Sequence, residues 1–224
     1  GWCTRIIAFG YAQYERYVLR RLDGAIFPCT VNGEDPFAGR CPHTALVDNS
    51  VKLEDFYERY DPEAVRNQDQ ICLTGSLTEA RGITSAIRAA ASAKCTLALA
   101  VLAKGQVAEV LQTSRVGLSP ILNRGQYWKG ENLATKICEY LAMGLPVVIN
   151  GSAYNRAFVE RWHCGICVDP ENVEEIASAI RYLLDHPEEA RQMGENGRQA
   201  VREEFNWGVE EKKLLALYEE IFKE

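Results

Sequence analysis

Two kinds of hydrophobic pattern alternate along most of the chain. Short apolar runs that end at Gly, Pro or a polar residue predict buried strands, and longer stretches with apolar residues three or four positions apart predict helices. The predicted strands are residues 71–74, 96–102, 116–120, 147–149 and 164–168, and the helices are 84–93, 107–113, 132–143, 173–184, one after Pro187, and 209–222. This alternation predicts βα units, so we expect an α/β fold with a Rossmann-like parallel sheet.

The first 45 residues contain too few elements for a complete domain. The pattern predicts a short strand at residues 5–9 ended by Gly10, a helix at 11–22 and a second strand at 25–27. Residues 30–42 carry Gly, Pro and an Asn-Gly pair, which predicts a loop. We therefore expect a short remnant of a preceding α/β domain.

The most informative stretch is residues 130–149. It predicts a loop, a helix, a left-handed cap at Gly144 and a buried strand. Glu131 and Glu139 bracket the predicted helix. At about 1.5 Å per residue their Cα atoms would lie roughly 12 Å apart. That separation suits contacts with two ends of one extended ligand, and it is too large for a carboxylate pair acting on one bond.

Composition and charge narrow the class of protein. The 224 residues are 47% hydrophobic and 25% charged, which can build a proper core. A net charge of −6 argues against a general nucleic-acid or anionic-membrane binder, so any phosphate site must be local. No apolar run approaches the roughly 20 residues of a transmembrane segment.

Eight cysteines are present, mostly inside apolar stretches, and we interpret them as reduced residues of a cytosolic protein. His163 and the pair Cys164 and Cys167 raise the possibility of a zinc or redox site. A structural role is favoured, because no second Cys or His pair stands at ligand spacing.

Three ordered segments carry a family resemblance. The Glu-x7-Glu pattern running into KICEYLAMGLPVVIN is preceded by ICLTGSLTEARGITSAIRAA and followed by CGICVDPENVEEIASAIRYLLDHPEEARQMGENGRQAVREEFNW. Together they resemble the C-terminal, donor-binding half of family 4 glycosyltransferases, which are retaining enzymes of GT-B architecture. The resemblance implies three parts: 1–45, a fragment of the N-terminal acceptor-side domain and linker; 46–205, the nucleotide-sugar-binding domain; and 206–224, a C-terminal crossover helix.

The same resemblance implies roles for particular residues. Glu139 would accept hydrogen bonds from the ribose, and Glu131 would face the donor sugar. Arg81 and Lys136 would neutralise the departing diphosphate, so Glu131, Arg81 and Lys136 are the candidate catalytic residues. The remaining candidate donor-binding positions are Asn132, Leu133, Ala134, Gly75 and Ser76.

Two departures from the family pattern concern the basic residues and the base pocket. Arg81 stands where the family usually has Lys, and Ser76 replaces a basic residue. Only a short segment separates LALAV from VAEVLQTSRVGLSP, where the family usually has an extra helix and strand that frame the nucleobase pocket. The chain lacks Asp-x-Asp, the usual metal-carrying signal of the other large glycosyltransferase fold, so we expect neither a metal nor a cofactor.

The expected activity is transfer of a hexose-type sugar from a nucleotide donor to a glycan or lipid-linked acceptor. The expected partners also include the missing N-terminal domain or a partner chain, and exclude nucleic acid. The expected location is the cytoplasm, including a peripheral place at the inner face of the membrane. Two alternatives stay open: a nucleotide-sugar epimerase of the same architecture, and a non-catalytic donor-binding or interaction subunit.

Overall fold

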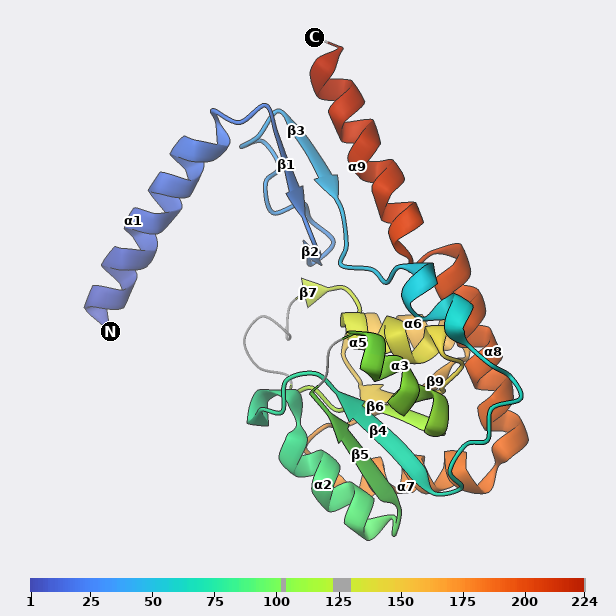
Figure 1. The fold of residues 1–224 in the computed structure, drawn as a ribbon. Helices are drawn as coiled ribbons and strands as arrows, with labels where there is room; N and C mark the ends of the chain where they lie inside the picture. Colours follow the sequence, from blue (N-terminus) through green and yellow to red (C-terminus); the bar gives the residue numbers. More distant parts are fainter. Residues whose placement is uncertain (102–103, 123–129, 224) are drawn as a thin grey trace. The chain divides into compact units, whose positions relative to one another are not determined.

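A computed structural model describes residues 1–101, 104–122 and 130–223. The chain divides into two compact units (Figure 1). The larger unit comprises residues 49–129 and 133–209, and the smaller comprises 1–48, 130–132 and 210–224. The predicted functional limits near residues 45 and 205 stay a prediction.

The larger unit is built on a five-stranded parallel sheet with the strand order β5-β4-β6-β8-β9. Its strands are β4 (Gln70–Thr74), β5 (Thr96–Ala100), β6 (Val116–Ser119), β8 (Val147–Asn150) and β9 (Gly165–Val168). The parallel sheet and the α/β class predicted from the hydrophobic pattern are confirmed.

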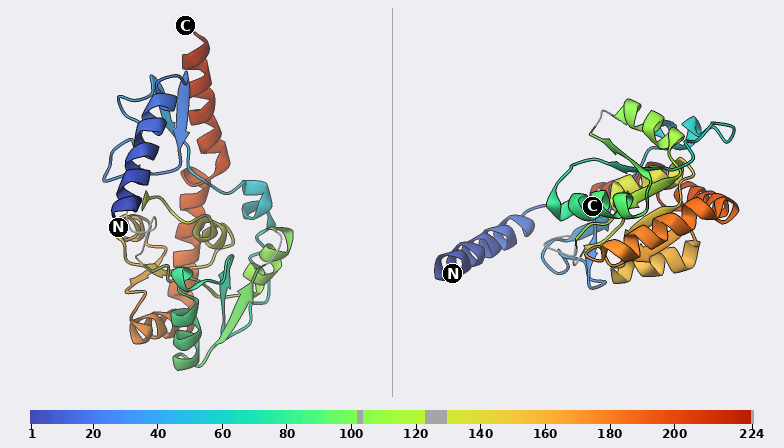
Figure 2. Two further views of the ribbon diagram at one scale, coloured as in Figure 1. Left: turned by 90° about the vertical axis from the view of Figure 1, so that its left-hand side faces the viewer. Right: turned by 90° about the horizontal axis from the view of Figure 1, so that it is seen from below.

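Helices cover both faces of this sheet, as the views in Figures 1 and 2 show. The helices are α2 (Ile83–Ser92), α3 (Lys104–Thr113), α5 (Thr135–Ala142), α6 (Ala153–Trp162), α7 (Val173–Asp185) and α8 (Pro187–Glu203). One core joins alternate strand residues such as Ile71 and Val148 to α2 and α7. The other joins Cys72 and Ile149 to α3, α5, α6 and α8. Burial on both faces explains why the central strands β4, β6 and β8 are mostly apolar.

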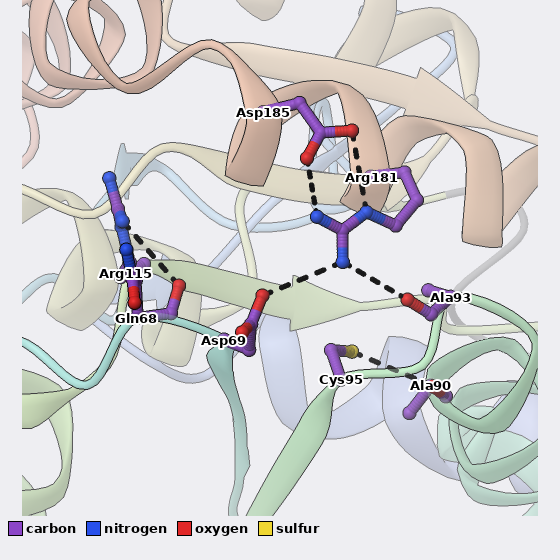
Figure 3. A network of polar contacts seen from close by, with 8 residues as sticks. All are labelled: Gln68, Asp69, Ala90, Ala93, Cys95, Arg115, Arg181 and Asp185. Atoms are coloured by element: carbon purple, nitrogen blue, oxygen red, sulfur yellow. Dashed lines mark hydrogen bonds and ion pairs between the residues drawn. The ribbon is translucent and has the colours of Figure 1, made fainter.

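A polar network joins the amino ends of strands β4 and β6 to the carboxyl ends of helices α2 and α7 (Figure 3). Arg181 on α7 donates to the carbonyl of Ala93, the residue that ends α2, at 3.2 Å. It also pairs with Asp185 on its own helix and with Asp69, which precedes β4, at 3.5 Å. Arg115 adds a bond to the carbonyl of Gln68 at 3.4 Å. The candidate site lies at the opposite edge of the sheet, where the strands have their carboxyl ends.

The described part of the smaller unit contains two short strand pairs, helix α1 (Trp2–Leu19) and most of helix α9 (Trp207–Phe222). Strand β1 (Gly24–Phe27) pairs in parallel with β3 (His43–Leu46), and β2 (Thr30–Val31) pairs antiparallel with β7 (Gly130–Glu131). Helix α9 begins in the larger unit and continues into this one. Two short 3-10 turns, Leu53–Asp55 and Tyr57–Arg59, lie near the start of the larger unit.

The predicted strand at residues 5–9 is wrong. Helix α1 runs from Trp2 to Leu19 without a break at Gly10. A short apolar run has no reliable period, and a single Gly inside a helix costs only about 1 kcal/mol relative to Ala. The strand predicted at 25–27 is confirmed by β1.

Two further elements differ from expectation. Helix α5 begins at Thr135 rather than at residue 132 and ends in the predicted left-handed cap at Gly144, whose φ is 66°. Helix α6 was not predicted, although its start carries a recognisable signal: Ser152 caps it by accepting a bond from the Asn155 amide at 3.1 Å. The segment ILNRGQYWKG at residues 121–130, for which the sequence predicts a loop, lies mostly outside the described residues.

Candidate functional site

The order of the strands defines where a ligand would bind. From β4 the chain first adds β5 on one side, and then returns to place β6 on the other side. In open α/β sheets, ligands bind outside the carboxyl ends of the strands where the winding direction reverses. Here that point lies beyond Thr74 on β4 and Ser119 on β6.

The chain turns sharply as it leaves β4. Gly75 has a φ of 89°, and a Cβ at this position would meet nothing within 4 Å, so the backbone borders open space. The Gly75 amide donates to the Ala100 carbonyl on β5 at 2.9 Å, and Ser76 beyond it is exposed. Gly75 therefore provides a turn and close backbone access, and its own N–H is already engaged.

Close backbone packing fixes the segment that carries Arg81. Arg81 ends a 3-10 turn (Glu79–Arg81), and Gly82 follows with a φ of 76°. A Cβ at Gly82 would overlap the carbonyl of Pro120, just beyond β6. The Leu122 amide also donates to the Ala80 carbonyl at 3.1 Å. These contacts anchor Arg81 beside the switch point.

Helix α5 presents an N-terminus with no side-chain cap. Its capping residue is Ala134, which has an extended backbone and no side-chain acceptor. The first helical residues are Thr135 and Lys136, whose amides lie at the positive end of the helix dipole. The N-terminus of a helix binds an anion favourably through its backbone N–H groups and its dipole, even without a charged side chain.

Lys136 is buried, with 8% of its surface exposed. Burial, together with the nearby positive charge of Arg81, lowers the pKa of Lys136 to about 8; Cys72 and Glu139 act in the opposite direction but are outweighed. A buried cation whose surroundings disfavour its charge is stabilised by an incoming anion. Lys136, Arg81 and the start of α5 thus form a local cationic site in an acidic protein.

The C-terminal end of α5 is held by two arginines. Arg66 donates to the carbonyls of Met143 and Gly144 at 3.0 and 3.3 Å. Arg198 on α8 donates to the Ala142 carbonyl, and its guanidinium lies over the rings of Tyr57 and Tyr60 at 4.0 and 3.9 Å. These bonds satisfy the final carbonyls of the helix and place positive charge at the negative end of its dipole.

Glu131 belongs to the smaller unit. Its carboxylate accepts bonds from the Thr30 hydroxyl at 2.6 Å and the Gly33 amide at 2.7 Å, and these two bonds lower the pKa of Glu131. The neighbouring Asn132 donates to Asp48 at 3.3 Å. Since Glu131 lies in a strand, the helical spacing assumed between Glu131 and Glu139 is wrong.

The structure therefore groups the predicted site residues in two sets. Arg81, Lys136 and Glu139 are electrostatically coupled, and Gly75 and Ser76 lie at the end of β4 in the same unit. Leu133 is buried in the core and Ala134 is the N-terminal capping residue of α5, whereas Glu131 and Asn132 belong to the other unit. Their roles toward a donor remain predictions.

Sequence reasoning missed Arg66 and Arg198. Isolated arginines carry no motif. The carbonyls that Arg66 binds are 77 and 78 residues away along the chain, and the one that Arg198 binds is 56 residues away. The one general signal for them is that the last carbonyls of a helix need hydrogen-bond donors from elsewhere in the chain.

The described residues contain neither a metal-binding cluster nor a membrane span. No group of three or more His, Cys, Asp or Glu residues within the described ranges has a geometry suited to a metal ion. None of the eight cysteines, all of which lie in the described ranges, forms a disulfide, and burial raises the pKa of Cys164 to about 12 and that of Cys167 to about 11. Among residues 1–101, 104–122 and 130–223, none of the helices combines the length and apolar character of a membrane span.

Comparison with known proteins identifies the class. The family described as glycosyl transferase-like matches residues 64–216, which is more than half of the chain and includes the whole cationic site. The chain therefore belongs to the glycosyl transferase-like family, and its larger unit has the fold of the C-terminal half of a GT-B glycosyltransferase.

Individual relatives agree with this assignment. The chain is 29% identical over 119 residues to the MMP alpha-(1->4)-mannosyltransferase of Mycolicibacterium hassiacum, a match that covers 53% of this chain and 27% of that protein. It superposes on sucrose-phosphate synthase from Thermosynechococcus elongatus with a TM-score of 0.71, 20% identity and coverage of 93% of this chain and 61% of the other.

The pneumococcal O-GlcNAc transferase GtfA, solved in complex with UDP and GlcNAc, gives a TM-score of 0.70 at 16% identity, with coverage of 96% and 48%. At these identities the structural matches show the fold alone. The match to the mannosyltransferase spans about a quarter of that protein's length.

Proposed function

We propose that the larger unit binds the diphosphate of a nucleotide-sugar donor and serves as the donor half of a retaining, family 4 hexosyltransferase. The observation that carries this proposal is the buried Lys136, placed beside Arg81 at the uncapped start of α5. Transfer from a nucleotide sugar requires a stabilised diphosphate leaving group, which two fixed cations and a helix N-terminus supply. Arg81 also suits bidentate binding of phosphate.

Glu139 is proposed to bind the ribose. It lies three residues after Lys136 on α5, within its electrostatic influence. If the phosphates of a nucleotide lie near Lys136, the carboxylate of Glu139 is placed to accept hydrogen bonds from its hydroxyls. The nucleotide-sugar donor is supported by the family match and by the UDP and GlcNAc bound to the GtfA neighbour. Glu131 keeps its proposed role toward the donor sugar.

The proposal includes a glycan or lipid-linked acceptor, which the name of the mannosyltransferase relative supports. It also includes an acceptor-side domain or partner chain, which the greater length of that relative supports. We also propose a cytoplasmic location, supported by the eight cysteines, none of which forms a disulfide. Diphosphate binding is proposed to need no metal, because the cations named above supply the charge.

The test is a thermal melt of the purified chain with UDP, GDP or ADP, each with excess chelator. Ligand at a hundred times its dissociation constant adds about 2.7 kcal/mol, which raises Tm by roughly 5–10 °C for a chain of this size. A shift seen only after magnesium or manganese is restored contradicts metal-free binding. No shift with any nucleotide contradicts the proposed function. Arg81→Ala should remove most of the diphosphate shift and leave any shift given by the nucleoside unchanged.

A further inference from the structure

Strands β4 and β6 separate before either strand ends. Their ladder contains the pairs Ile71↔Val116 and Cys72↔Gly117 and then stops. On its other edge β4 stays paired with β5 as far as Thr74↔Ala100, and β6 stays paired with β8 as far as Ser119↔Ile149. The separation is therefore local to the switch point, where the ligand is proposed to bind.

The hydroxyl of Tyr140 on α5 lies in this opening. Its oxygen accepts the Thr74 backbone N–H at 2.8 Å and lies 3.1 Å from the Thr74 hydroxyl. On the other side it donates to the Leu118 carbonyl at 3.5 Å. The phenol thus bridges β4 and β6 in place of the next ladder bond.

Gly117 makes room for the ring. A Cβ at Gly117 would overlap Tyr140, so only glycine allows the aromatic ring to lie against this strand. Tyr140 is fully buried, and burial raises the pKa of Tyr140 far above its ordinary value. The hydroxyl therefore stays neutral at every physiological pH and acts as a fixed donor and acceptor.

The other side of the opening also carries a polar group. Ser119 is fully buried, and its hydroxyl has no hydrogen-bond partner among the residues described. Buried hydroxyls are nearly always paired, with protein or with a ligand or water. An unpaired one next to the switch point indicates a polar occupant.

We propose that Tyr140 is a positioning residue for the diphosphate, an inference that rests on the proposed function. By holding the Thr74 amide, its hydroxyl keeps β4 and β6 apart and fixes the direction in which the chain enters the Gly75 turn. The backbone of Gly75 and Ser76 is thereby aligned with the start of α5, the helix that carries Tyr140 itself. The donor diphosphate lies between these two segments.

The test compares Tyr140→Phe with wild type. This substitution keeps the ring against Gly117 and removes one oxygen. Binding is measured by calorimetry with chelator present, using whichever of UDP, GDP and ADP stabilises wild type most, and separately its nucleoside. The dissociation constant for the diphosphate should rise by about three- to tenfold, as expected for one lost hydrogen bond. The dissociation constant for the nucleoside should not change.

The matched control is Tyr182→Phe, which removes the hydroxyl of an exposed tyrosine on α7 that donates to Glu189 on α8. It should leave both affinities unchanged. A purely structural role for Tyr140 would lower Tm without changing the diphosphate affinity of the folded protein, and that result overturns the inference. Wild-type protein that binds no diphosphate instead rejects the proposed function, and the positioning role with it.

Should Tyr140→Phe not fold, hydrogen exchange of the wild-type chain decides. Diphosphate should slow amide exchange across residues 74–78, and the nucleoside should not. Unchanged exchange in this segment, measured under conditions in which diphosphate binding to the protein is independently seen, overturns the inference.

Discussion

Burial and, after it, the positive charge of Arg81 lower the pKa of Lys136, although 55 residues separate these two cations in sequence. Two cations are brought together at the start of a helix that already favours anions, and one of them is buried. Like charges in such an arrangement destabilise the empty protein. The site is therefore organised for a ligand with more than one negative charge, and this relationship can be tested through pH.

Diphosphate affinity should fall as the pH rises through about 8. Below this pH the Lys136 ammonium is charged in the free protein, and above it the amine becomes neutral, so binding must then include the uptake of a proton. Between pH 7.5 and 9.5 the affinity should fall by about tenfold or more, while the ligand stays fully ionised because its last phosphate pKa is near 6.

The measurement is calorimetry in buffers of different ionisation enthalpy, which reports the proton uptake directly. Lys136→Met should bind more weakly at pH 7.5 and show little pH dependence over this range. Equal pH dependence in the variant and in wild type would exclude Lys136 as the titrating group.

Lys136→Met should also make the chain more stable at pH 7. The difference between the ordinary pKa of 10.5 and about 8 corresponds to a cost of roughly 3 kcal/mol for keeping the buried ammonium charged. Removing it should raise Tm by about 5–10 °C. Differential scanning calorimetry checks this, with Lys52→Met, at an exposed lysine, as the control that should not change Tm. A less stable Lys136→Met protein would show that the lysine stabilises the fold.

Glu139→Ala should weaken nucleotide binding and leave the fold intact. A hydrogen bond to a charged group contributes about 1.5–3 kcal/mol, so the affinity should fall by roughly one to two decades. Because Glu139 raises the pKa of Lys136, the variant should also lose diphosphate affinity at a lower pH than wild type. A ligand without ribose hydroxyls separates the two effects: it should bind wild type weakly, and the substitution should alter its affinity only through the lowered pKa of Lys136. Unchanged affinity for the normal nucleotide would place Glu139 outside the site.

Gly82→Ala should destabilise the chain far more than Gly39→Ala. Both glycines have a positive φ, and only Gly82 lies against another backbone, at the carbonyl of Pro120. Gly39→Ala should cost about 1 kcal/mol for the left-handed conformation alone, and Gly82→Ala more than about 2 kcal/mol because the Pro120 segment must move. Urea unfolding measures both. Equal losses would mean that the contact between Gly82 and Pro120 does not constrain the loop that carries Arg81.

The sequence predicts the larger unit well because each of its elements has a strong local pattern. The strands at Ile71, Val116 and Val147 are short apolar runs that end at polar residues or glycine, and the structure places them in one parallel sheet. The smaller unit was harder to predict. Residues 5–9 form part of helix α1, although the apolar run from Ile6 to Phe9 would fit a strand equally well. The side chains of Ile7 and Phe9 are exposed in the structure. With no burial to decide between the two, the pattern is ambiguous.

The candidate site was predictable only where a motif names its residues. Arg81, Lys136 and Glu139 follow from a family pattern, and the structure couples them. The roles of Tyr140 and Arg198 depend on contacts between segments far apart in the chain, which no local pattern encodes. The placement of Glu131 in a strand was missed because the apolar period of α5 was extended backwards through Leu133, a residue buried ahead of the helix.

The two arginines at the end of α5 have a consequence for the rate and entropy of binding. Arg66 and Arg198 hold the last carbonyls of this helix, and the guanidinium of Arg198 lies on two tyrosine rings, before any ligand arrives. An anion that meets the other end of α5 then encounters a helix that is already ordered, so its binding energy is not used to build the site. We expect association close to the diffusion-controlled range, a small entropy loss in the protein, and differences in affinity between ligands that arise mainly from how fast they leave.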